Sequence, residues 1–130
     1  MSVSYGFGKQ VDGSMDEVVD KVKKALAEVG FGILTEIDVK ATLKKKIDKD
    51  VAPYLILGAC NPKLASRALE VEESIGLLLP CNVVVRESEG GKISVEFLDP
   101  NAISGLAGGG KLDFLAAEAR PLLEKAMAAL

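Results

Sequence analysis

The chain has 130 residues, 48% hydrophobic and 27% charged, so we expect a single domain over residues 1–130 that is large enough to bury its own hydrophobic core. Its net charge of −3 argues against nucleic-acid binding, because no basic field is present to attract phosphates. Histidine is absent, which excludes Ser-His-Asp and Cys-His catalysis and histidine-ligated zinc.

The first predicted elements are a strand and a helix. Apolar or long side chains alternate with small ones over residues 3–11, which predicts a strand, although the glycines within it weaken the pattern. Ser14 and Glu17 have the spacing of a capping box, so a helix is expected to begin there. Its apolar positions recur at steps of three and four, and Gly30 is placed to end it.

The next elements are a strand over residues 32–37 and a short basic helix capped by Asp38. Four apolar residues repeat every fourth position in this helix, and lysines occupy its other faces. We interpret the lysines as a solvated face of an amphipathic helix in preference to an anion-binding site. The apolar positions are Val39, Leu43, Ile47 and Val51.

Residues 54–60 are apolar without alternation, as expected of a central strand that is covered on both faces. Asn61 is a preferred N-cap and Pro62 suits the first helical position, so a helix begins here and closes near Glu72 to Gly76. A strand follows over residues 82–87.

A hairpin turn over residues 89–92 leads to a last strand over residues 93–97, which pairs back antiparallel. The glycine-rich stretch 103–110 is expected to form a flexible loop with at most one helical turn. Residues 111–130 are helical in pattern, and Pro121 predicts a kink or break near residues 119–120.

This order of elements predicts a two-layer α+β domain with a largely antiparallel sheet and helices on one face. A central strand that is apolar on both sides also indicates that a second chain protects part of the sheet.

Two sequence motifs carry a family resemblance: residues 58–62, which read GACNP, and residues 76–83, which read GLLLPCNV. With the preceding stretch 31–39, they resemble the family called domain of unknown function 302 over nearly the whole chain. The resemblance implies a fold of the TATA-binding-protein-like class, a homodimer, and no established activity. Shared fold does not carry DNA binding with it.

The first candidate site consists of Cys60, Cys81 and Asn61. Cys60 directly precedes a helix N-terminus, where the helix dipole stabilises a thiolate. If the two strands lie side by side, both sulfurs face one pocket and can switch to a disulfide, bind a soft metal or attack an electrophile. Alternatively, both are small buried hydrophobic residues. Two thiols fall short of a zinc site, so no metal is assigned.

The second candidate is an anion site at Gly109, Gly110 and Lys111, where the sequence matches G-x-x-x-x-G-K. Leu112 stands where a phosphate-binding loop has Ser or Thr, so simple anion binding is favoured over nucleotide hydrolysis. A third candidate is a carboxylate site formed by Glu36, Asp38 and Glu96. We favour solvated or capping carboxylates as the explanation of this third set.

Three functions stay open. The first is a small cytoplasmic homodimer that binds a ligand or senses redox state through Cys60 and Cys81. The second is a thiol-dependent enzyme in which Cys60 is the nucleophile and Cys81 the resolving thiol, and the third is a structural interaction module. The N-terminal segment lacks signal-peptide features, and no apolar run approaches the ~20 residues that span a bilayer, so no membrane partner is expected. The sequence identifies no cofactor.

Overall fold

The computed structural model describes residues 3–130. Its strands are β1 (Gly6–Val11), β2 (Gly32–Asp38), β3 (Tyr54–Cys60), β4 (Cys81–Glu87) and β5 (Ile93–Leu98). They form one sheet in the order β1-β5-β4-β3-β2, and every neighbouring pair is antiparallel. The sheet edges are therefore β1 and β2.

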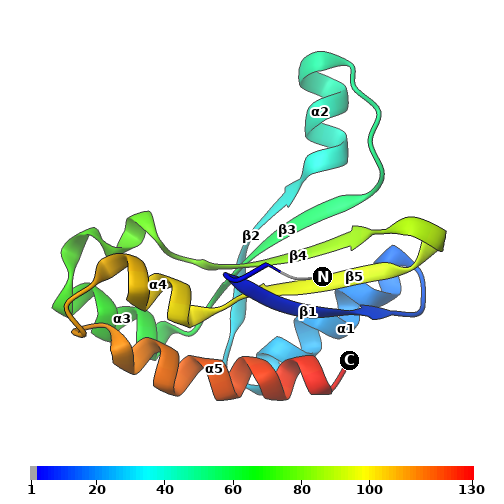
Figure 1. Cartoon of the computed structure of the whole chain (residues 1–130). Coiled ribbons are helices and arrows are strands. Elements are labelled where there is room, and N and C mark those ends of the chain that lie inside the picture. Colours follow the sequence, from blue (N-terminus) through cyan, green and yellow to red (C-terminus); the bar gives the residue numbers. More distant parts are fainter. Residues whose placement is uncertain (1–2) are drawn as a thin grey trace.

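Most of the helices lie on one face of this sheet (Figure 1). The helices are α1 (Met15–Glu28), α2 (Val39–Ile47), α3 (Pro62–Val71), α4 (Pro100–Ala107) and α5 (Asp113–Ala128), with 3-10 turns η1 (Glu73–Leu77) and η2 (Glu89–Gly91). Figure 1 shows α1, α3 and α5 on the same side of the sheet, whereas α2 projects away from the opposite side. The predicted two-layer α+β class is confirmed, with α2 as the exception to helices on one face.

Side-chain caps begin the first three helices at the predicted residues. The hydroxyl of Ser14 accepts a hydrogen bond from the backbone N–H of Glu17 at 3.2 Å. The carboxylate of Asp38 accepts from Ala41 at 2.9 Å. The side-chain oxygen of Asn61 accepts from Leu64 at 3.2 Å, and Pro62 occupies the first turn. Each cap satisfies a backbone donor that lacks a partner within its helix.

The core lies between the helix layer and the facing side of the sheet. Leu57, Val83 and Val95 come from adjacent strands and are at most 1% exposed. Phe97 on β5 contacts Phe7 on β1 edge to face, with ring centroids 5.8 Å apart. The Arg120 guanidinium of α5 lies 3.7 Å from the centre of the Phe7 ring, so it covers the edge of this core.

The C-terminal third differs from expectation at two places. Residues 103–107 of the glycine-rich stretch belong to a helix, α4, which begins because Asp99 accepts from the Asn101 N–H at 2.9 Å and Pro100 occupies the first turn. Pro121 does not break α5, which continues from Asp113 to Ala128. Packing of one side of α5 into the core offsets the backbone hydrogen bond that the proline removes.

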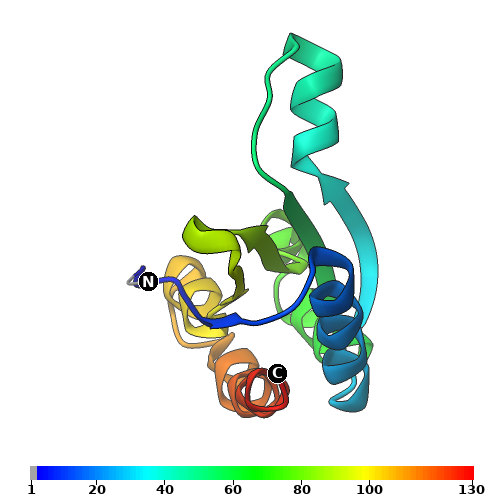
Figure 2. The same cartoon turned by 90° about the vertical axis from the view of Figure 1, so that its right-hand side faces the viewer.

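The expectation that β3 is covered on both faces is also wrong for the single chain. Leu57 and Ala59 are buried beneath the helices, but Ile56 points to the other face and is only half-buried. No helix lies across that face within the described part of the chain (Figure 2). We call it the open face of the sheet.

Candidate functional site

An apolar cavity of about 280 Å³ lies where β3 ends, β4 begins and α3 starts. Its wall contains both cysteines, one asparagine and otherwise apolar residues or glycine, and no charged side chain. The lining residues are Phe31, Leu34, Ala59, Cys60, Asn61, Leu64, Ala65, Leu69, Gly76, Leu79, Pro80, Cys81, Leu115 and Ala119. The structure therefore brings Cys60, Cys81 and Asn61 to one cavity.

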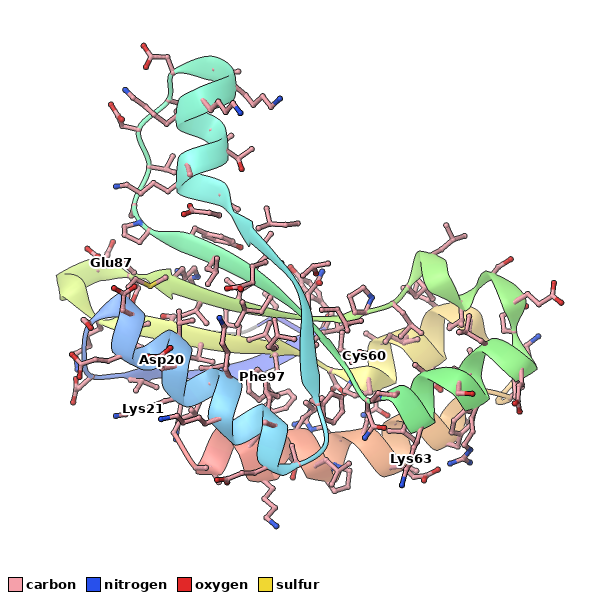
Figure 3. All side chains as sticks on the ribbon, turned by 180° about the vertical axis from the view of Figure 1, so that it is seen from behind. Asp20, Lys21, Cys60, Lys63, Glu87 and Phe97 are labelled. Atoms are coloured by element: carbon pink, nitrogen blue, oxygen red, sulfur yellow. The ribbon has the colours of Figure 1, made fainter. Side chains whose placement is uncertain are left out.

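The antiparallel pairing of β3 and β4 puts the two cysteines at this end of the sheet. Cys60 is the last residue of β3 and Cys81 the first residue of β4, and Cys81 is paired with Ala59 rather than with Cys60. Both cysteines are free thiols, so no disulfide joins them. Figure 3 shows Cys60 at the β3 end that leads into α3.

Burial governs the acidity of both thiols. It raises the pKa of Cys60 above its ordinary value of 9.0. It also raises the pKa of Cys81 to about 11, with a smaller contribution from the charge of Cys60. An apolar wall disfavours a thiolate, and the pKa of Cys60 is raised although the residue directly precedes α3. Both sulfurs are therefore neutral S–H groups near pH 7.

The amide oxygen of the other polar side chain of the wall is already engaged. The side-chain oxygen of Asn61 accepts the Leu64 N–H, so it serves the helix start. Leu79 and Pro80, joined by a cis peptide bond, complete the wall next to Cys81. The cavity thus offers apolar contact and two weakly polar thiols, which is a surface for an uncharged molecule.

The second candidate, Gly109, Gly110 and Lys111, lies away from this cavity. The Lys111 ammonium is 3.4 Å from a Glu72 carboxylate oxygen. Asp113 places a negative charge in the first turn of α5, where it accepts a hydrogen bond from the Ser104 hydroxyl at 2.6 Å. These contacts join the start of α5 to α4 and the residue before it to the segment between α3 and η1, and they favour a structural role for Lys111 over anion binding.

The carboxylates of the third candidate each have a separate structural partner. Glu36 pairs with Lys23 at 3.0 Å, and Glu96 pairs with Arg86 at 2.9 Å. Asp38 caps α2. The three do not form a common site, because two strands, β4 and β3, separate Glu96 on β5 from β2.

Sequence reasoning missed most of the cavity wall. Leu115 and Ala119 come from α5, more than fifty residues along the chain from Cys60, and Phe31 precedes β2. Their spacing of four residues on α5 indicates a buried helix face, but no local pattern states which part of the sheet that face meets. The two thiols could be found from sequence because they directly flank predicted strands.

Comparison with known proteins identifies relatives across the whole domain. A family model described as "Domain of unknown function DUF302" matches residues 7–130. The crystal structure of an uncharacterized conserved DUF302 protein from Bacillus stearothermophilus is similar, with a TM-score of 0.88, 27% sequence identity and 98% of each chain covered. No curated protein matches the sequence. Within residues 3–130, no helix has the length and apolar character needed to cross a bilayer.

Proposed function

We propose that this chain, which belongs to the family described as Domain of unknown function DUF302, binds a small uncharged apolar molecule beside Cys60 and Cys81. The observation that carries the proposal is the cavity at the end of β3 and β4, whose wall contains two thiols and no charged side chain. A charged ligand would lose its hydration there without gaining a counter-charge.

The volume of the cavity sets the size of the ligand. A cavity of about 150 Å³ lined by aliphatic and aromatic side chains stays dry and binds benzene. At about 280 Å³, the present cavity has room for a fused two-ring or short branched hydrocarbon. Sulfur makes favourable contacts with aromatic rings, so the two thiols favour an aromatic ligand.

The test compares naphthalene with 1-naphthoate, which adds a negative charge to the same ring system. A ligand that binds only the folded chain raises the free energy of unfolding, and with it the melting temperature. At a ligand concentration tenfold above the dissociation constant, the gain is about 1.4 kcal/mol. We expect naphthalene to raise the melting temperature by several degrees and 1-naphthoate to leave it unchanged. Equal shifts with both compounds would contradict an apolar site.

Two matched variants locate the effect. Ala65 lines the cavity, so Ala65→Leu fills part of it and is expected to abolish the naphthalene shift. Ala117 is exposed on α5 and does not line the cavity, so Ala117→Leu makes the same change outside the cavity wall and should preserve the shift. A shift that survives Ala65→Leu would assign naphthalene binding to another surface.

Redox sensing is the second candidate, favoured by the presence of both thiols on one cavity wall. Oxidation by a peroxide requires the thiolate, and the raised pKa of both cysteines makes that form scarce near pH 7. The same property weighs against Cys60 as a catalytic nucleophile. We therefore rank ligand binding first.

We also propose that the protein works in the cytoplasm and as a homodimer. A reducing compartment keeps the thiols free, as ligand contact requires. The family resemblance implies the homodimer.

A further inference from the structure

The wall of the cavity beside the two cysteines has a buried end, which we call the floor. The side chains of the floor are at most 7% exposed and come from the segment before β2 and from β3, α3 and α5. Phe31 gives the floor an aromatic side chain, against which a ligand ring can pack edge to face or offset. The floor consists of Phe31, Ala59, Leu64, Leu115 and Ala119.

Two large apolar side chains of the same wall reach solvent. Leu34 on β2 is 65% exposed and Leu69 on α3 is 46% exposed, and both line the cavity. We call this pair the rim. A single exposed leucine is ordinary on a protein surface, but these two border a cavity whose wall has no charged side chain. Apolar surface therefore continues without interruption from the floor to solvent.

A β-bulge in the edge strand β2 brings Leu34 to the rim. Ile33 pairs with Ala59 and Thr35 pairs with Gly58, so Leu34 is an extra residue without a partner on β3. In a regular ladder Leu34 would oppose Gly58 and lie on the open face of the sheet. The shifted register needs a glycine at position 58, because a Cβ there would clash with the Thr35 hydroxyl. Bulges next to binding sites commonly redirect a side chain in this way.

Cavity volume and rim together restrict the shape of the ligand. At about 280 Å³ the cavity has room for a two-ring system, so a larger ligand has to extend past the rim. Alkyl groups lying on Leu34 and Leu69 would remove apolar surface from water on both sides of the contact. The far end of such a chain would remain hydrated, so a charge placed there loses no solvation.

On the basis of the proposed function, we infer that the ligand is an aromatic ring system that carries an alkyl chain. The ring packs on the floor beside Phe31, and the chain lies along Leu34 and Leu69 toward solvent. The site accepts a polar or charged group at the end of the chain but rejects one on the ring. A ligand chain fits the rim better than a protein partner, because two side chains are far fewer than the roughly twenty residues that each side of a stable interface contributes.

Three probes that share one ring system test where the chain lies: naphthalene, 2-naphthoate and naphthylbutanoate, in which three methylene groups separate the carboxylate from the ring. The protein has no tryptophan, so naphthalene fluorescence reports binding directly. A fully buried methylene strengthens binding by about fourfold, and a half-covered one by about twofold. We expect naphthylbutanoate to bind about five- to tenfold more tightly than naphthalene, and 2-naphthoate to show no binding.

Rim variants locate the gain. In Leu34→Ala together with Leu69→Ala, the affinity ratio of naphthylbutanoate to naphthalene should fall below about twofold. Both dissociation constants are measured on the same variant, so a general change in the cavity affects both compounds and largely cancels in the ratio. Leu106→Ala is the matched control, because Leu106 is 75% exposed on α4 and does not line the cavity. It should keep the ratio of the natural chain.

The outcomes separate this ligand class from the apolar site itself. If naphthalene binds but naphthylbutanoate does not, the ligand is enclosed by the cavity, and only the chain at the rim is ruled out. A ratio that is unchanged in the double rim variant would place the chain on another surface and also overturn the inference. If none of the three probes binds, the proposed apolar site is wrong as well.

Discussion

The environment of Cys81 shows how a neighbouring fold element decides the chemistry of a residue. From the sequence, both thiols could be placed at strand ends, and a helix dipole next to Cys60 predicted a lowered pKa. In the structure the pKa of Cys60 is raised instead, and so is that of Cys81, because both thiols are desolvated in an apolar wall to which α5 contributes. Desolvation depends on tertiary packing, which a local motif does not encode.

The raised pKa of Cys81 makes stability depend on pH in the alkaline range. The folded state holds the thiol proton up to about pH 11, whereas the unfolded chain releases it near 9. Between these values the folded state binds more protons, so the free energy of unfolding falls as pH rises from about 9 to 11, by an amount on the order of 2 kcal/mol.

Urea unfolding at pH 8 and pH 10.5 measures this effect. Lysines and tyrosines also titrate in this range, so the informative quantity is the difference between the natural chain and Cys81→Ala. We expect the natural chain to lose more stability than the variant. A pH dependence that is identical in both would show that Cys81 has the same pKa in the folded and unfolded states.

Helix starts are the elements that local sequence predicted best. Ser14, Asp38 and Asn61 cap α1, α2 and α3, because an N-cap is a contact within four residues and needs no distant partner. The helix α4 was missed although Asp99 and Pro100 repeat the pattern of Asn61 and Pro62. Glycine lowers helix propensity, so the glycines of this stretch predicted a loop.

Removing the cap of α3 should destabilise the element that carries the cavity wall. Asn61→Ala loses the hydrogen bond to the Leu64 N–H and is expected to cost about 1 kcal/mol of unfolding free energy. Asn61→Asp keeps an acceptor oxygen and should cost much less. Chemical denaturation of both variants checks the prediction, and equal losses would assign another role to the amide.

In strand β1, by contrast, a glycine that weakens the strand pattern of the sequence is required by the packing of the sheet. A Cβ atom at Gly8 would clash with the backbone carbonyl of Val95 on β5, so the residue allows close approach of the two strands. Local sequence does not reveal this because the clash involves a strand more than eighty residues away.

Gly8→Ala is therefore expected to destabilise the fold by about 1–3 kcal/mol through overpacking. The matched control is Gly32→Ala in β2, where a Cβ would meet no atom within 4 Å. In thermal unfolding, Gly8→Ala should have a clearly lower melting temperature than Gly32→Ala. Comparable melting temperatures would mean that β1 moves to accommodate the methyl group.

In residues 3–130, helices cover one face of the sheet and none lies across the other. The α+β class, the antiparallel order and the family resemblance could be predicted because strands and turns alternate in recognisable patterns. The projection of α2 could not, since an amphipathic pattern shows that a helix has an apolar face but not what covers it. The cavity formed by α3, α5 and the strand ends is likewise a property of the assembled layers.

Protection of the thiols by ligand tests the central claim most directly. Iodoacetamide should alkylate Cys60 and Cys81 slowly in the natural chain, and saturating naphthalene should slow both reactions further by filling the cavity that they line. A reporter thiol introduced by Ser66→Cys at an exposed position should react at the same rate with and without naphthalene. If naphthalene stabilises the chain but leaves the alkylation rates of Cys60 and Cys81 unchanged, the ligand lies elsewhere and the proposed site is wrong.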